Sequence, residues 1–95
     1  RVITMIFTPG HSPGHQSFLI TLPTSGAILL TIDAAYTADH WNNKALPGLI
    51  HSAADSANSV AKLRLIAEKH KAMVVTGHDP VQWKIFRKAP NRFYT

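Results

Sequence analysis

The chain contains no cysteine, few acidic residues and no long hydrophobic run, and each shortage excludes some classes of protein function. Without cysteine, the protein cannot hold a disulfide framework, cysteine-ligated zinc, an iron–sulfur cluster or a cysteine nucleophile. The longest strongly apolar run covers residues 26–32, far short of the ~20 residues that cross a bilayer. We therefore expect no membrane partner, and we expect any transition metal to be bound by histidine and carboxylate.

Length and charge set further bounds. The 95 residues, 45% of them hydrophobic, suffice for a packed core in one small domain or part of a larger one. The net charge is +5, but the basic residues are scattered and form no nucleic-acid-binding motif, so no nucleic acid partner is expected. No leader opens the sequence, which favours a cytoplasmic location. Six histidines against five acidic residues is an unusual ratio that points to metal or acid–base chemistry.

Residue patterning in the first half of the chain predicts strands. Residues 2–7 are rich in β-branched and aromatic residues and end at a Thr-Pro-Gly breaker. Residues 18–22 alternate, and residues 27–32 run apolar without a break, so we expect a hairpin whose second strand is buried on both faces. Residues 34–52 show little periodicity and are expected to be irregular.

The second half predicts helix, strand and helix, so the fold class is α/β. Residues 53–70 form an amphipathic helix pattern, with an apolar stripe at 3.6-residue spacing. Residues 72–76 predict a short buried strand, and Asp79-Pro80 suits the N-cap and first position of a helix ending near Phe86. The apolar stripe comprises Ala53, Val60, Leu63, Ile66 and Ala67.

Three polar residues each follow a predicted strand: His11, Asp33 and His78. Strand ends present catalytic groups because the sheet fixes their position while the loop leaves the side chain free. Two imidazoles and a carboxylate suit Zn²⁺, or Fe or Mn, and such a metal supports hydrolysis by lowering the pKa of bound water. Taken singly, each residue is more often an ordinary surface residue. His15 could be a ligand or could merely hydrogen bond the loop.

The pattern as a whole resembles a known superfamily. Its parts are Thr-Pro-Gly-His-Ser-Pro-Gly-His at residues 8–15, Leu-Leu-Thr-Ile-Asp-Ala-Ala-Tyr at residues 29–36, and Gly-His-Asp at residues 77–79. Together they resemble the second half of a metallo-β-lactamase-fold hydrolase, and within that superfamily they are most similar to the N-acyl-homoserine lactonases. The 22-residue and 45-residue separations of His11, Asp33 and His78 also suit that family.

This resemblance implies a role for each matching residue. His11 would complete the shell of a first metal, Asp33 would bridge two metals, and His78 would bind the second. Tyr36 matches the tyrosine that lactonases direct at the substrate carbonyl, and Trp41 is a candidate for substrate contact. His15 would brace the loop and bind no metal. The implied reaction is attack of a metal-bridging hydroxide on the lactone ring, with two Zn²⁺ ions per complete site.

The same family carries a His-x-His-x-Asp-His cluster that does not occur in residues 1–95. We therefore interpret residues 1–95 as one partial domain, the C-terminal half of a metallo-β-lactamase-type αββα sandwich. The missing N-terminal half, or another chain, would complete the site. Three protein ligands cannot hold two metals tightly, so we expect the isolated chain to bind zinc weakly and to open no lactone.

Other functions remain open at this point. The same fold serves glyoxalase-type thioesterases, phosphodiesterases and β-lactam hydrolases, and Tyr36 is the main reason to prefer a lactonase. A non-catalytic basic binding module is the third possibility. The basic residues do not alternate regularly with aromatic residues, which counts against this third possibility.

Overall fold

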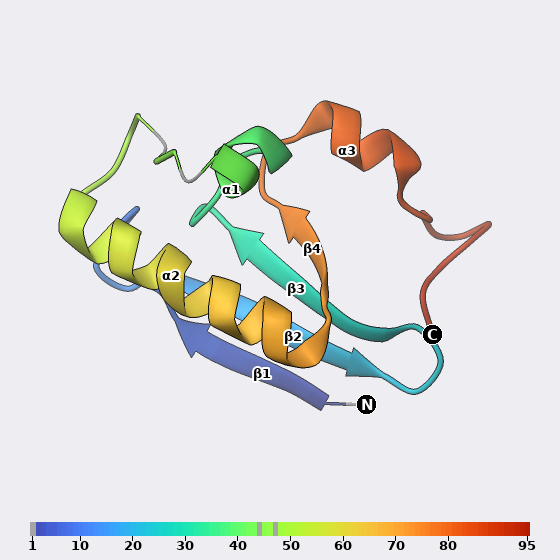
Figure 1. The fold of residues 1–95 in the computed structure, drawn as a ribbon. Helices are drawn as coiled ribbons and strands as arrows, with labels where there is room; N and C mark the ends of the chain where they lie inside the picture. Colours follow the sequence, from blue (N-terminus) through green and yellow to red (C-terminus); the bar gives the residue numbers. More distant parts are fainter. Residues whose placement is uncertain (1, 44, 47) are drawn as a thin grey trace.

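The computed structural model describes residues 2–43, 45–46 and 48–95. Its sheet has the order β1-β2-β3-β4 and consists of β1 (Val2–Phe7), β2 (Gln16–Leu22), β3 (Gly26–Ile32) and β4 (Met73–Thr76). The first two pairings are antiparallel and β3 pairs with β4 in parallel, so β1, β3 and β4 all run in one direction (Figure 1). The predicted α/β class is confirmed.

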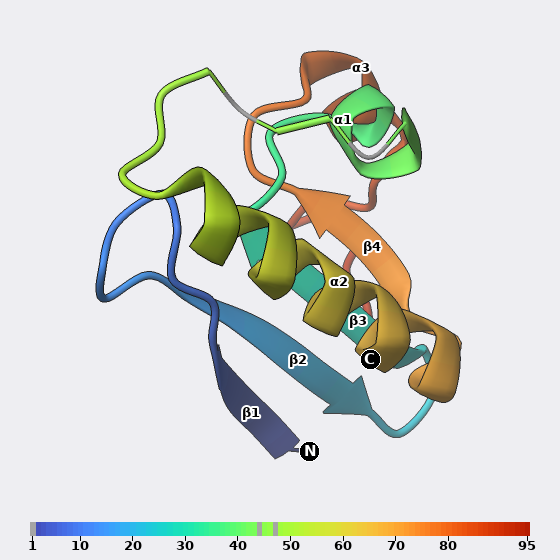
Figure 2. The ribbon, with the colours of Figure 1, turned by 60° about the vertical axis from the view of Figure 1, so that its left-hand side comes forward.

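Helix α2 (Ala53–His70) lies across one face of the sheet and has the predicted bounds (Figure 2). The Ser52 side chain caps its start by accepting the Asp55 amide, and Lys71 ends it in the left-handed conformation. Its Leu63 packs with residues from three strands and the loop after β3, in a core of Ile6, Leu19, Leu29, Ala34 and Leu63. None of the helices in the described part of the chain is long and apolar enough to span a membrane.

The buried side of α2 differs from the predicted stripe at its first turns. Ala53 is exposed, whereas Ser56 and Ser59 are buried. The cause is the loop after β1, which packs on this end of the helix: the Ser59 hydroxyl donates to the Pro9 carbonyl, and a Cβ on Gly10 would collide with the Ser56 backbone. The two serines therefore fix the position of the loop that carries His11.

Residues 34–52 are less irregular than predicted, because they contain the short helix α1 (Ala38–Asn43). Its start is held by a distant residue, since the Asp79 carboxylate accepts the Ala38 amide. Lys44 and Pro47 of this segment lie outside the described residues. The last helix, α3 (Pro80–Ile85), begins at the predicted N-cap Asp79 and ends one residue before Phe86.

The sheet face opposite α2 carries two apolar cross-strand rows, which we call the open face. Trp83, Phe86 and Tyr94 line a pocket against its β3 and β4 side. On the β1 side, Ile3 and Met5 are 66% and 68% exposed. The rows are Ile3, Ile20, Ile28 and Met73, and Met5, Phe18, Leu30 and Val75.

Candidate functional site

The carboxyl ends of β1, β3 and β4 meet at one edge of the sheet, because these three strands share a direction (Figure 1). His11 lies in the loop after β1, Asp33 directly follows β3, and His78 lies two residues after β4. Topology thus brings together three side chains that are up to 67 positions apart in the sequence.

Asp33 lies between the two histidines. Its Oδ2 is 3.3 Å from His11 Nε2, and its Oδ1 is 2.6 Å from His78 Nε2. The side chains of His11 and Asp33 are about a quarter exposed and that of His78 is 60% exposed, so the cluster opens to solvent on the His78 side. His11 Nδ1 lies 3.2 Å from the Leu49 carbonyl oxygen, a contact that orients the imidazole ring with its Nε2 toward Asp33.

Close contact between the ends of β3 and β4 sets the approach of Asp33 to His78. A Cβ on Gly77 would collide with the Ile32 carbonyl oxygen, so only glycine fits there. The Gly77 and His78 amides donate to the carbonyls of Ala35 and Tyr36, at 3.0 and 2.8 Å. The loops after the two strands are therefore bound to each other through their backbones.

The backbone at Ile32 is strained. Its φ is 54°, in the left-handed region that a β-branched residue rarely adopts, and the β3–β4 register shifts between Leu30 and Ile32. Such a conformation costs about 1–3 kcal/mol and persists only where the surroundings hold it. It places Asp33 beside both histidines.

Tyr36 lies in the same cluster. Its hydroxyl is 3.3 Å from His11 Nδ1, and its ring contacts that of His78 edge-on with centroids 4.6 Å apart. A phenol in this position can donate a hydrogen bond to an oxygen atom placed beside it. An open pocket that adjoins the cluster is lined by Thr76, Gly77, His78, Asp79, Pro80 and Trp83.

His15 lies beneath the cluster and is 8% exposed. Its Nδ1 is 2.9 Å from the Thr8 carbonyl oxygen, and its Nε2 accepts the backbone amide of Asp33 at 3.0 Å. The loop-bracing position expected for this residue is the one it occupies. Its contact with the Asp33 backbone was not predicted.

Asp79 connects three parts of this edge of the sheet. One carboxylate oxygen accepts the Val81 and Gln82 amides at the start of α3, and the other accepts the Ala38 amide at the start of α1. The amides of Gln82 and Ala38 lower the pKa of Asp79, because they stabilise its charged form. Asp79 thus joins the loop of His78 to the loop of Tyr36.

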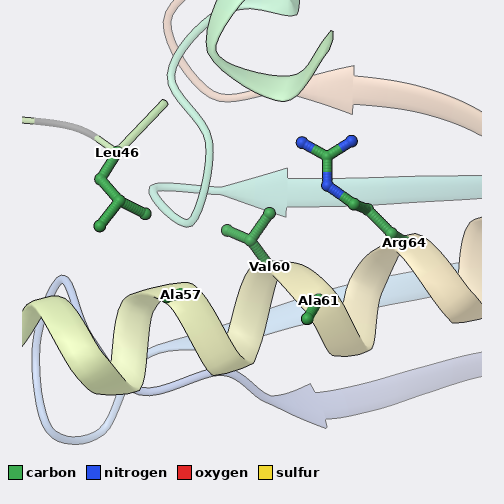
Figure 3. A pocket seen from close by; sticks show the side chains of 5 residues that line it. All are labelled: Leu46, Ala57, Val60, Ala61 and Arg64. Atoms are coloured by element: carbon green, nitrogen blue, oxygen red, sulfur yellow. The ribbon is translucent and has the colours of Figure 1, made fainter. Parts of the chain in front are cut away.

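Trp41 lies elsewhere, on α1, where it packs against the hydrophobic core. The Arg64 guanidinium lies 4.7 Å above its ring and donates to its carbonyl oxygen. Figure 3 shows a pocket along α2 that includes Arg64 of this pair; it is lined by Leu46, Ala57, Val60, Ala61 and Arg64. A substrate contact of Trp41 stays a prediction.

The donor set suits part of a metal site. Imidazole nitrogen and carboxylate oxygen are the ligands that Zn²⁺ prefers when no thiolate is present. Within residues 2–43, 45–46 and 48–95, however, no group of three or more His, Asp or Glu side chains is arranged to enclose an ion. His78 Nε2 instead donates to Asp33 Oδ1, which a metal would have to displace. The three residues fit as a partial shell that needs further ligands.

The sequence predicted most of this cluster and missed its support. His11, Asp33, His78 and Tyr36 come together, whereas Trp41 does not join them. The missed contacts are the bond from His15 to the Asp33 amide and the bond from Asp79 to α1. A usable signal for the first was the presence of inward-facing Ser17 and Thr31 in otherwise apolar strands.

Comparisons with known proteins agree with the geometry. No protein-family model matches the chain. The chain is 65% identical over 92 residues to the N-acyl homoserine lactonase AttM of Agrobacterium fabrum, an alignment that covers 97% of this chain and 35% of the relative. It is 38% identical over 88 residues to the lactonase AiiA of Bacillus thuringiensis subsp. kurstaki, covering 93% of this chain and 35% of that relative.

Solved structures give the same result. An N-acyl homoserine lactone hydrolase with the product N-hexanoyl-L-homoserine at its catalytic metal centre superimposes with a TM-score of 0.88 at 36% identity, over 96% of this chain and 36% of that one. The resemblance stated from the motifs is confirmed. The chain spans about a third of the length of the relatives it matches.

Proposed function

We propose, from the premise that this chain is a homologue of part of the N-acyl homoserine lactonases, that it supplies part of the active site of an enzyme that opens N-acyl homoserine lactones. The observation that carries the proposal is the position of Asp33, whose two oxygens face the Nε2 atoms of His11 and His78 beside the Tyr36 hydroxyl. Two imidazoles and a carboxylate can contribute ligands to a divalent metal, and a phenol can donate a hydrogen bond to a lactone carbonyl oxygen, which together suit metal-assisted hydrolysis.

In this proposal His11, Asp33 and His78 would hold divalent metal, with Zn²⁺ the expected ion. When bound, the metal would act as a Lewis acid that activates water and polarises the lactone carbonyl. The bond from His11 Nδ1 to the Leu49 carbonyl orients the ring and directs its Nε2 at the site. Tyr36 would donate to the carbonyl oxygen as negative charge develops on it.

The proposal includes a missing segment that completes the site. Two metals need more ligands than three residues provide, and the matched relatives are about three times as long as this chain. The open face gives a second reason, because Ile3, Met5 and Phe7 on its β1 side are more than half exposed. A contiguous apolar patch of this kind marks an interface. We expect the segment to pack there, as the other half of an αββα sandwich would.

A chimera tests the proposal. The matching segment of Agrobacterium fabrum AttM is replaced by this chain, and the product is loaded with Zn²⁺. We expect the chimera to bind metal stoichiometrically and to open N-hexanoyl homoserine lactone. Ring opening is measured by the proton that it releases in weakly buffered solution. The 95-residue chain alone should show neither.

Asp33→Asn in the chimera should abolish both metal binding and ring opening, because an amide carries no negative charge and is a weaker ligand than a carboxylate for such a metal. Asp55→Asn, an exposed change in the first turn of α2, serves as the matched control and should leave both unchanged. Equal activity of the two variants would sink the proposal, and so would turnover by the purified isolated chain.

A further inference from the structure

Three buried polar side chains form a hydrogen-bonded chain beneath the candidate site, and the chain ends at the backbone of a fourth buried polar residue, Thr31. Thr8, His15, Ser17 and Thr31 are between 0% and 8% exposed. His15 Nδ1 lies 2.9 Å from Thr8 Oγ1, Thr8 Oγ1 lies 2.8 Å from Ser17 Oγ, and Ser17 Oγ donates to the Thr31 carbonyl at 2.9 Å. Buried polar groups cost free energy unless they are hydrogen-bonded, so a connected set of three buried side chains beneath the site needs a reason.

The direction of each hydrogen bond follows from backbone groups that can only donate or only accept. The Asp33 amide can only donate, so His15 Nε2 must carry a lone pair. The Thr8 carbonyl can only accept, so His15 Nδ1 must carry the proton. His15 is therefore neutral and in a single tautomer. Because Ser17 donates to the Thr31 carbonyl, the Thr8 hydroxyl is left to donate to Ser17.

The chain of bonds ends at the strained part of the backbone. Ile32 has a φ of 54°, and the amide that His15 accepts belongs to the next residue, Asp33. Loss of that acceptor would leave a half-buried amide without this partner and would release the peptide unit that sets the direction of the Asp33 side chain. The Thr31 hydroxyl supports the same turn by donating to the Ala35 carbonyl at 3.0 Å.

We propose that His15 is a positioning residue: its neutral imidazole accepts the Asp33 amide and holds the strained turn in the conformation that presents the Asp33 carboxylate to His11 and His78. The positioning of Asp33 stands on the geometry alone. Only its consequence for metal binding rests on the proposed lactonase function.

A scalar coupling across the hydrogen bond tests the geometry without any metal. In the full chain labelled with ¹⁵N, we expect a coupling between the Asp33 amide nitrogen and His15 Nε2, and a His15 ring protonated at Nδ1. The same coupling is measured in the metal-free chimera, so a chain that does not fold alone still gives an answer. A folded protein with His15 protonated at Nε2 would overturn the proposal.

Two substitutions separate positioning from mere packing. In His15→Gln the amide oxygen can reach the place of Nε2 and still accept from Asp33. In His15→Asn the shorter side chain can replace only Nδ1, so the Asp33 amide loses its acceptor while the bond to Thr8 is kept. We expect the Asp33 amide to exchange with solvent about tenfold faster or more in His15→Asn and to stay protected in His15→Gln.

Metal affinity of the chimera gives the second readout, with Zn²⁺ alone as the probe. Loss of a group that orients a metal ligand weakens binding about 10–100-fold, which is the result expected for His15→Asn, whereas His15→Gln should stay within about threefold of the parent. An equal loss in both variants would show that His15 only fills space. A chimera that binds no metal would sink the proposed function, while the coupling and exchange measurements would still decide the role of His15.

Discussion

Both carboxylate oxygens of Asp33 face an imidazole, and its backbone amide faces a third. The two side-chain contacts could be predicted, because they require only that polar residues follow strands that end at one edge. The backbone contact could not, since it depends on the left-handed conformation of Ile32, which no β-branched residue favours on its own. The sequence thus predicted which chemical groups the site contains, whereas the strained backbone at Ile32 sets the orientation of Asp33.

The role of Tyr36 is tested by removal of its hydroxyl. Tyr36→Phe in the chimera should lower kcat for lactone opening by about 10²-fold with little change in metal content, because one donor to the developing oxyanion is lost. Tyr94→Phe is the matched control, since Tyr94 contacts Arg87 in the C-terminal segment. Unaltered lactone opening by Tyr36→Phe would instead favour a hydrolase for thioesters or phosphodiesters.

Among the helices, α2 was the most predictable from the sequence and α1 the least. Helix α2 has its own caps and apolar stripe, so its bounds could be predicted from local sequence. Helix α1 has six residues, and the Asp79 carboxylate holds its first amide from 41 positions away. A short segment stabilised by so distant a partner carries no local signal. Helix α1 bears on the site because it directly follows the loop that carries Tyr36.

Close packing of β3 on β4 is tested at Gly77. Gly77→Ala should destabilise the fold by about 1–3 kcal/mol, because the new methyl group collides with the Ile32 carbonyl and pushes the two strand ends apart. Gly14→Ala is the control, since its added methyl group meets no atom within 4 Å. Thermal unfolding of both variants decides the matter, and equal midpoints would contradict the packing described for the strand ends.

The molecule as a whole has one covered and one partly open sheet face. Helix α2 covers the first face (Figure 2). On the open face, Ile3 and Met5 of β1 are exposed. The predicted partial domain is consistent with this asymmetry and stays a prediction. Sequence could indicate that β1 is apolar, but whether a strand lies at the edge or the centre of a sheet depends on the order of the strands in space.

A charge on the open face should act in opposite directions in two settings. Met5→Lys should reduce self-association of the isolated chain, measured by sedimentation velocity, because it breaks the exposed apolar surface. In the chimera the same change should lower the unfolding midpoint, because the charge would be buried. Leu65→Lys, an equally exposed position on α2, is the control and should leave the chimera unchanged. A chimera that tolerates Met5→Lys would place the interface elsewhere.

The left-handed conformation of Ile32 makes this one position a trade-off between thermal stability and accurate placement of the next side chain. Glycine adopts this conformation freely, so Ile32→Gly should relieve local conformational stress and resist heat at least as well as the parent. The same backbone freedom would leave the Asp33 carboxylate less firmly positioned, and catalytic turnover should fall. Laboratory evolution under heat alone should therefore drift toward glycine here, and selection for turnover should restore a bulky residue.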